Sequence, residues 1–232
     1  MAGRGLEPVN LAEHQEIIDR FLGLYSGGLC QTYRDMGQSK AMPPWAEVYW
    51  LGKQVVKCPM DLWIYQEIIC ETRPELIVET GTSGAGSAWF FAHILEAAKI
   101  NGGSVITVDK DSYPHLCLPH PRVKYLIGDC VSDTIAQLIR AAACGKRTMV
   151  SLDSLHTYSH VARELELYAP LVTPGCYLVV EDTGLGGSGA GTDWCSRAVS
   201  EFLAVNSGYV VDKSRERHLL TSNRDGWIKR NH

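Results

Sequence analysis

Three carboxylates and a histidine stand at two points in the sequence where buried strands are expected to end. Asp153 and His156 follow one apolar run, and Glu181 and Asp182 follow another. If these two strands are neighbours in a parallel sheet, the three carboxylates converge at one edge and repel one another. A divalent cation relieves that repulsion, and hard oxygen donors favour Mg²⁺, Mn²⁺ or Ca²⁺ over zinc. We therefore expect Asp153, Glu181 and Asp182 to bind a divalent metal ion.

His156 lies three residues after Asp153, in the turn that leaves the strand, where it could face the same hollow. A neutral imidazole there can accept the proton of a hydroxyl group whose pKa a metal ion has lowered. We therefore predict that His156 is a general base that activates a hydroxyl for attack on a carbon atom. A structural contact at the start of a helix is the alternative role for this histidine.

A glycine-rich turn precedes this region and reads Glu79-Thr80-Gly81-Thr82-Ser83-Gly84-Ala85-Gly86-Ser87. Glycines let the backbone approach a ligand closely, and the N-terminus of the following helix supplies free N–H groups. The spacing differs from the G-x-G-x-x-G of dinucleotide sites. The acid two residues before the first glycine suits a ligand with a cationic amino-acid end and no pyrophosphate.

Two further acids complete a predicted nucleoside site. Asp109 ends the next strand and suits ribose hydroxyls, and Asp129 follows the third strand and suits an adenine amino group. The E-x-G-x-x-x-x-G-S pattern of the turn resembles motif I of S-adenosylmethionine-dependent methyltransferases, and this resemblance implies binding of S-adenosylmethionine. Two alternatives stay open: a capped turn without a ligand and a nicotinamide-cofactor fold. The residues predicted to bind the nucleoside are Glu79, Gly81, Thr82, Ser83, Ser87, Asp109 and Asp129.

Strands and helices alternate from residue 76 onward, which predicts parallel βαβ units in an α/β sheet covered on both faces. The last two strands are too close in sequence for a crossover, so we expect an antiparallel hairpin. A seven-stranded, mostly parallel sheet with this ending is the Rossmann-like layout of class I methyltransferases. The expected strands are 76–78, 105–108, 123–127, 148–152, 177–180, 209–211 and 218–221. The expected helices are 11–25, 61–72, 87–100, 132–143, 159–171 and 194–206.

Composition excludes several classes of protein. The chain has 232 residues, with 22 Lys and Arg against 26 Asp and Glu, and a net charge of −4, which argues against a nucleic-acid partner. It has no apolar run near the ~18 residues that cross a bilayer and no secretory leader, so we expect no membrane partner. The eight cysteines form no C-x-x-C pair, which favours reduced thiols in a cytoplasmic protein.

This length suits one large domain with an extension. We predict that residues 1–72 are a helical and loop N-terminal extension that covers the active site. Residues 73–232 are then the methyltransferase domain.

Two blocks of sequence resemble a known family. Residues 152–183 and the pattern Lys57-x-Pro59-x-Asp61-x-Trp63, preceded by Trp50-Leu51-Gly52, are similar to the cephalosporin hydroxylase and rhamnosyl O-methyltransferase family. The resemblance covers about residues 45–230. It implies a class I methyltransferase fold, S-adenosylmethionine and Mg²⁺ as cofactors, a homo-oligomer, and a role in natural-product or antibiotic biosynthesis.

The same resemblance assigns roles within the site. It implies that Asp153, Glu181 and Asp182 are the metal ligands. Macrolide-sugar O-methyltransferases are more distantly similar, share the Asp-x-x-His and Glu-Asp patterns, and use the histidine as general base, which supports that role for His156.

We therefore expect a Mg²⁺-dependent O-methyltransferase that acts on a hydroxyl of a small natural-product-type acceptor. The alternatives are a hydroxylation-assisting protein, an N-methylating family member, and a non-catalytic partner subunit of a biosynthetic complex. The loop 184–191 departs from the family pattern because it is rich in glycine. This departure bears on the identity of the acceptor and leaves the cofactor unaffected. The loop is either a lid over the acceptor site or a linker without contacts. The aromatic segment 43–50 covers the active site or contacts another subunit.

Overall fold

The computed structural model describes residues 47–111, 117–185 and 194–232. The helix expected at 11–25, most of the loop 184–191 and the first part of the aromatic segment lie outside these residues. Among the described helices, none is both long and apolar enough to cross a bilayer.

The central feature is a seven-stranded sheet in the order β5-β4-β3-β6-β7-β9-β8. The five strands from β5 to β7 are parallel, and β9 is antiparallel to both of its neighbours. This confirms the predicted sheet of seven strands with an antiparallel end. The strands are β3 (Leu76–Thr80), β4 (Ser104–Asp109), β5 (Val123–Ile127), β6 (Thr148–Leu152), β7 (Tyr177–Val180), β8 (Tyr209–Val211) and β9 (Trp227–Arg230).

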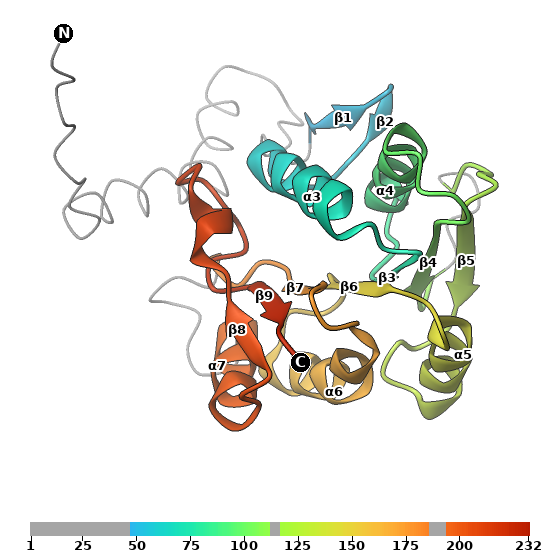
Figure 1. Ribbon diagram of the computed structural model, residues 1–232. Helices are drawn as coiled ribbons and strands as arrows, with labels where there is room; N and C mark the ends of the chain where they lie inside the picture. The colour runs from blue at the N-terminus through green and yellow to red at the C-terminus, as the bar shows by residue number, and fades with distance from the viewer. Residues whose placement is uncertain (1–46, 112–116, 186–193) are drawn as a thin grey trace, which may run out of the picture.

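Helices cover both faces of the sheet (Figure 1), as the alternation of strands and helices predicts. On one face lie α3 (Pro59–Thr72) and α4 (Gly86–Ala97), and on the other lie α5 (Asp133–Ala143), α6 (Tyr158–Tyr168) and α7 (Cys195–Val205). Each face has its own buried apolar core. The core under α3 and α4 includes Tyr65 and Trp227, whose ring centroids lie 5.0 Å apart. Through these contacts α3 packs as a layer of the main fold.

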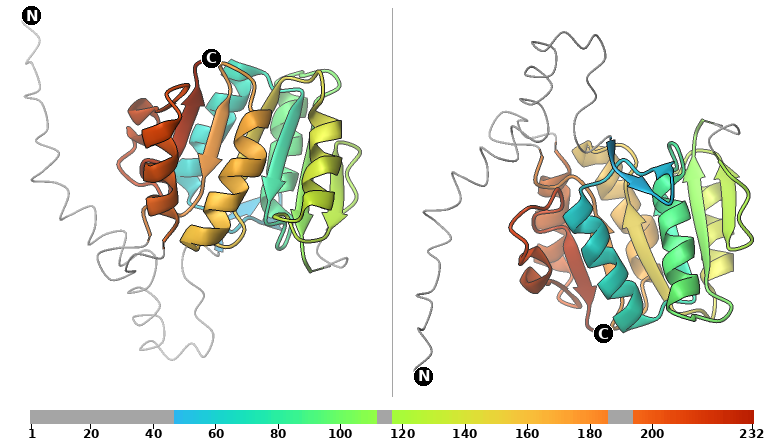
Figure 2. Two further views of the ribbon diagram at one scale, coloured as in Figure 1. Left: turned by 90° about the horizontal axis from the view of Figure 1, so that it is seen from below. Right: turned by 90° about the horizontal axis from the view of Figure 1, so that it is seen from above.

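A small hairpin that the sequence analysis treats as loop precedes α3. It consists of β1 (Tyr49–Trp50) and β2 (Lys53–Gln54) and lies at the carboxyl ends of the parallel strands (Figure 2). Trp50 packs edge-on against Phe90 of α4, with ring centroids 4.9 Å apart. The hairpin therefore forms part of the rim around that edge of the sheet.

The expected strand at 218–221 is wrong. The strand that pairs with β8 is β9, which begins at Trp227 and inserts between β7 and β8. Leu219 has a left-handed φ of 66°, which a strand does not tolerate, and a short 3₁₀ helix over Lys213–Glu216 comes before it. The connection crosses α3, where the backbone N–H of Ser222 donates to Asp61.

Asp61, in the first turn of α3, is a buried acid whose ionisation opposes folding. It is 1% exposed, and only its Oδ2 has a hydrogen-bond partner, at 2.8 Å from the Ser222 nitrogen. Burial raises the pKa of Asp61 to about 8. Between the ordinary pKa near 4 and this value the folded chain holds a proton that the unfolded chain releases, so stability falls as pH rises.

We predict that Asp61→Asn removes part of this pH dependence. The free energy of unfolding of the wild type should fall from pH 5 to pH 8 by up to ~1.4 kcal/mol per pH unit for this group. The variant should show a shallower slope in urea unfolding followed by circular dichroism. Asp133→Asn, at an exposed acid, serves as the control and should keep the wild-type slope. Equal slopes in wild type and Asp61→Asn would contradict the assignment.

Candidate active site

The carboxyl ends of β3 and β6 meet at the point where the chain reverses its direction of winding, since β3 leads on to β4 and β6 to β7. Open α/β sheets bind ligands in the crevice at such a point. Gly81 follows β3 with a φ of +88°, and a Cβ there would lie 1.9 Å from the carbonyl oxygen of Asp153. The backbone N–H of Asp153 also donates to the Thr80 carbonyl at 3.0 Å. The two turns therefore pack backbone against backbone.

Two glycines of this turn are required by contacts within the chain itself. At Gly81 the close neighbour is the Asp153 backbone, and at Gly86 a Cβ would lie 2.0 Å from the carbonyl oxygen of Gln54 in β2. At Gly84 a Cβ would meet no atom within 4 Å. Close approach within the chain itself therefore explains two of these glycines.

Two cavities open on either side of the Gly81 turn and share Gly81, Ser83 and Asp153. One, of about 330 Å³, is also lined by Asp109 and Gly128. The other, of about 360 Å³, lies between this turn and the β1–β2 hairpin, and Ser87 contributes to its wall. Together they form a two-part depression along the sheet edge, next to the carboxylates of β6 and β7.

Glu79, at the base of the turn, carries a buried oxygen that lacks a partner. Its Oε2 accepts a hydrogen bond from the Thr107 hydroxyl at 2.7 Å, whereas Oε1 has no hydrogen-bond partner. Burial raises the pKa of Glu79 to about 7. An unpartnered buried carboxylate oxygen fits a cationic group of a ligand, because such a group would supply the missing hydrogen bond and charge.

The other predicted nucleoside residues are divided between structural contacts and the cavities. The Thr82 hydroxyl contacts that of Thr107 at 2.8 Å, and the Ser83 N–H donates to Asp109 Oδ2 at 2.8 Å. Asp129 pairs with Lys110 at 3.1 Å and does not line either cavity. Its neighbours Gly128 and Cys130 line the smaller cavity instead.

Asp153, His156 and Asp182 lie together, with one potential ligand atom from each within 4.8 Å of the others. His156 Nε2 is 3.2 Å from Asp182 Oδ2 and 3.8 Å from Asp153 Oδ1. The three side chains are 22–29% exposed, so solvent can reach them. This arrangement offers both oxygen donors for a cation and a base beside them.

The backbone of Asp182 is held in an unfavourable conformation. Its φ is +60°, in the left-handed region that non-glycine residues rarely occupy. The Asp182 N–H donates to Asn223 Oδ1 at 3.0 Å, and the Trp194 indole donates to the Asp182 carbonyl at 3.0 Å. Such strain persists where the surroundings fix it, often at functional sites. Here it turns the Asp182 side chain towards His156.

Glu181 points to a different place from Asp182. Its carboxylate accepts hydrogen bonds from the Tyr65 hydroxyl and, at 3.4 Å, from Ser151, and it pairs with Lys57 at 2.9 Å. Lys57 also pairs with Asp153 at 2.6 Å, and its own side chain is 3% exposed. A buried ammonium group thus joins the two strand ends.

The pKa values at this edge reflect burial first and the charges of the neighbouring carboxylates and Lys57 second. Burial, reinforced by the charges of Glu181 and Asp182, raises the pKa of Asp153 well above its usual range. Burial and the charge of Glu181 likewise raise the pKa of Asp182. Burial also opposes ionisation of Glu181, but Lys57 and the Tyr65 hydroxyl outweigh it and lower the pKa of Glu181.

The charges at this edge fit a divalent cation. Three carboxylates, those of Asp153, Glu181 and Asp182, face the single buried ammonium of Lys57, which leaves two negative charges uncompensated when all are ionised. The oxygen-rich donor set is the kind that Mg²⁺ prefers.

A family model described as Rhamnosyl O-methyltransferase/CmcI matches residues 43–231. The chain belongs to this family. The match includes both sequence blocks that suggested the resemblance, and it spans the described sheet, the β1–β2 hairpin and the carboxylate edge.

Curated relatives and solved structures agree with this membership. The Rhamnosyl O-methyltransferase of Mycobacterium leprae is 34% identical over 149 residues, which are 62% of this chain and 63% of the relative. That of Mycobacterium tuberculosis is 33% identical over 150 residues, 62% of this chain and 60% of the relative. The chain thus spans about 60% of the length of these relatives. A CmcI structure with Mg and SAM has a TM-score of 0.63 at 20% identity, covers 86% of this chain and 84% of its own, and confirms the class I methyltransferase fold.

Three residues that contact the carboxylates of the site were not predicted from the sequence. Lys57 stands in the Lys-x-Pro-x-Asp-x-Trp block. That block suggested the family, but nothing in the sequence showed which residues Lys57 contacts. Tyr65 follows about two helical turns later. Asn223 lies between the wrongly expected strand at 218–221 and β9. Their partners are distant in sequence, so spacing alone could not connect them.

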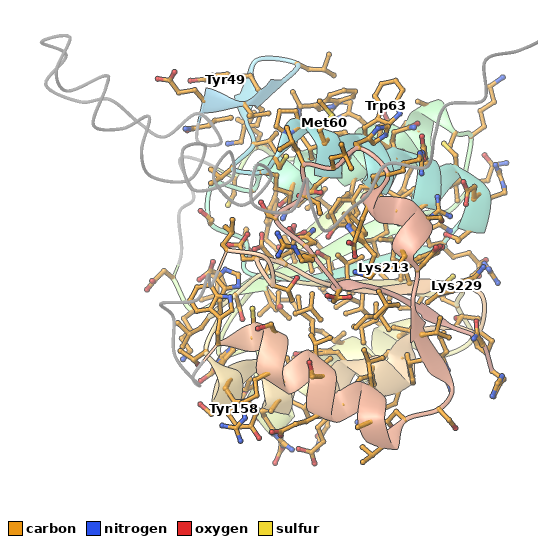
Figure 3. All side chains as sticks on the ribbon, turned by 90° about the vertical axis from the view of Figure 1, so that its left-hand side faces the viewer. Tyr49, Met60, Trp63, Tyr158, Lys213 and Lys229 are labelled. Carbon is orange, nitrogen blue, oxygen red and sulfur yellow. The ribbon has the colours of Figure 1, made fainter. Side chains whose placement is uncertain are left out.

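We predict that Lys57→Met destabilises the fold by about 3–5 kcal/mol, because it leaves buried carboxylates unpaired. Glu181→Gln in the same chain should recover part of the loss. Urea unfolding at pH 7 measures both effects. Lys213→Met is the matched control, since Lys213 makes its ion pairs on the outer surface (Figure 3) and should cost less than ~1 kcal/mol. A loss no larger than that of the control would refute the buried pairing.

Proposed function

We propose that this protein is an S-adenosylmethionine-dependent O-methyltransferase that requires Mg²⁺. The observation that carries the proposal is the contact between the Gly81 turn and Asp153, which sets the nucleoside-sized cavities directly beside the carboxylates and His156. Family membership supports it, since the curated relatives are named as Rhamnosyl O-methyltransferases.

The nucleoside is assigned to the two cavities at the Gly81 turn. Glu79, which is buried beneath the turn and lines neither cavity, would supply the negative charge for the cationic amino group, and Asp109 would receive the ribose hydroxyls. The adenine end would lie towards Gly128 and Cys130, which line the smaller cavity next to Asp129. Thr82, Ser83 and Ser87 shape the turn that holds the amino-acid end. S-adenosylmethionine, when bound, supplies an electrophilic methyl group on a sulfonium.

The proposed ligands of Mg²⁺ are Asp153 and Asp182, whose ligand atoms lie together, and Glu181, which would have to turn from Lys57 and Tyr65 to join them. Lys57 would compensate the remaining negative charge. When bound, Mg²⁺ supplies the positive charge that makes an acceptor hydroxyl more acidic. His156 Nε2 takes the hydroxyl proton as the oxygen attacks the methyl carbon. Asp182, 3.2 Å from that nitrogen, stabilises the imidazolium that results.

The acceptor is proposed to be a hydroxyl on a small sugar-bearing molecule. The names of the curated relatives support a rhamnosyl group. A role in natural-product biosynthesis and assembly into a homo-oligomer remain predictions from the family resemblance.

We predict saturable binding of about one S-adenosylmethionine per chain in calorimetry with MgCl₂ present. Glu79→Gln should weaken binding about tenfold or more, because the variant loses a buried charge that faces the ligand's ammonium. Glu75→Gln, at an exposed acid just before the same strand, is the control and should bind like wild type. Absence of binding by the wild type would reject the cofactor assignment.

We predict that His156→Ala lowers the rate of methylation by ~10²–10⁴ if the histidine is the base. The assay follows S-adenosylhomocysteine formation with a panel of p-nitrophenyl glycosides that includes the rhamnoside. His218→Ala, at an exposed histidine, should leave the rate unchanged, and EDTA should abolish turnover by the wild type. A loss of less than threefold in His156→Ala would exclude the base and favour an acceptor that needs no deprotonation, such as an amine.

A further inference from the structure

A second cluster of polar side chains lies on the α6 side of the sheet edge, and the proposed function uses it only as part of the wall of the cavity assigned to the nucleoside. It comprises Cys130, Ser154, His160 and Glu164, hereafter the Cys130 cluster. Cys130 follows β5, Ser154 follows β6, and His160 and Glu164 lie one turn apart on α6. Cys130 is 5% exposed and Glu164 is fully buried.

The distances within the Cys130 cluster are those of metal ligands around one centre. Cys130 Sγ lies 3.4 Å from His160 Nε2 and 3.5 Å from Glu164 Oε1, and the last two atoms are 3.8 Å apart. Zinc–ligand bonds of ~2.0–2.3 Å at tetrahedral angles place neighbouring ligand atoms ~3.3–3.6 Å apart. The three atoms therefore already form a triangle of nearly the right size without any ion between them.

The electrostatics of the Cys130 cluster also call for a cation. Glu164 Oε1 accepts from the Ser154 hydroxyl at 2.7 Å, whereas Oε2 is buried and has no hydrogen-bond partner. Among the described residues, the one ion pair recorded for Glu164 is with His160. A buried carboxylate with so little compensation is costly, and a bound cation would remove that cost.

We propose that Cys130, His160 and Glu164 form a zinc site, distinct from the carboxylates at Asp153 and Asp182. One sulfur, one imidazole nitrogen and one carboxylate oxygen are the ligand types that zinc binds, with Ser154 or water in the fourth position. The S–H bond of Cys130 breaks as the sulfur–zinc bond forms, and the proton passes to solvent. The inference stands independently of the proposed methyltransferase function.

Other roles for Cys130 fit less well. Burial, followed by the charge of Glu164, raises the pKa of the Cys130 thiol to about 12, so without a metal it stays protonated. A protonated, buried thiol is a poor nucleophile and resists oxidation. Cys130, Ser154 and His160 line the cavity of about 330 Å³, which provides the path by which an ion can reach the site.

Cobalt(II) provides the test, because a thiolate bound to Co²⁺ gives a ligand-to-metal charge-transfer band that carboxylates and imidazoles alone do not give. The full-length protein is freed of metal with a chelator, reduced, and titrated with CoCl₂ at neutral pH. We expect this band, with visible bands of a tetrahedral centre, to saturate at one Co²⁺ per chain. Equimolar ZnCl₂ should abolish it. Absence of the charge-transfer band would overturn the proposal.

Variants then locate the ligands. Cys130→Ser should lose the charge-transfer band, and His160→Gln should weaken cobalt binding at least tenfold. Cys70→Ser and Cys144→Ser, at exposed cysteines, should keep the band, and Asp182→Asn should keep it because that residue belongs to the other site. Circular dichroism confirms that each variant is folded, and if Cys130→Ser is not, His160→Gln decides. An unchanged band in either cluster variant would overturn the proposal.

Discussion

The ammonium group of Lys57 lies between Asp153 and Glu181, at the carboxyl ends of β6 and β7. Without it, the repulsion among the acids of this edge would favour their protonation or their separation. Lys57 comes two residues before α3, so the same interaction fixes where that helix meets the sheet. One side chain thus links the start of α3 to the charge of the site.

The backbone contact between Gly81 and Asp153 supplies the complementary constraint. It sets the distance between the turn after β3 and the carboxylates after β6 without any side chain at Gly81. On the far side, Asn223 and Trp194 fix the backbone of Asp182. Backbone contacts therefore fix the positions of Asp153 and Asp182 from both sides, as positioning of the site residues requires.

Hydrophobic runs and turn residues were enough to predict the parallel core of the fold. The strands at 148–152 and 177–180 are where the hydrophobic pattern places them, because helices bury both faces of each strand. The strand at 123–127 is also where it was predicted, although it is an edge strand without a fully buried residue. The last strand was misplaced because residues 218–221 contain two leucines that suggest a strand. The left-handed backbone of Leu219 bends the chain there instead. The proximity of Asp153, His156 and Asp182 could be predicted, because the strands that they follow are neighbours in the sheet. The Lys57 and Tyr65 contacts to Glu181 were not, since they depend on how α3 docks.

The late position of β9 in the chain has a consequence for how the molecule is made. As the polypeptide leaves the ribosome, β7 emerges well before β9, its partner on that side, so its free edge is open to pairing with other strands in the interval. Asn223, which bonds to the Asp182 N–H, emerges just before β9. Nascent chains that stop short of Trp227 would therefore carry the glycine turn and the acids of β6 and β7, yet lack the strand that completes the sheet.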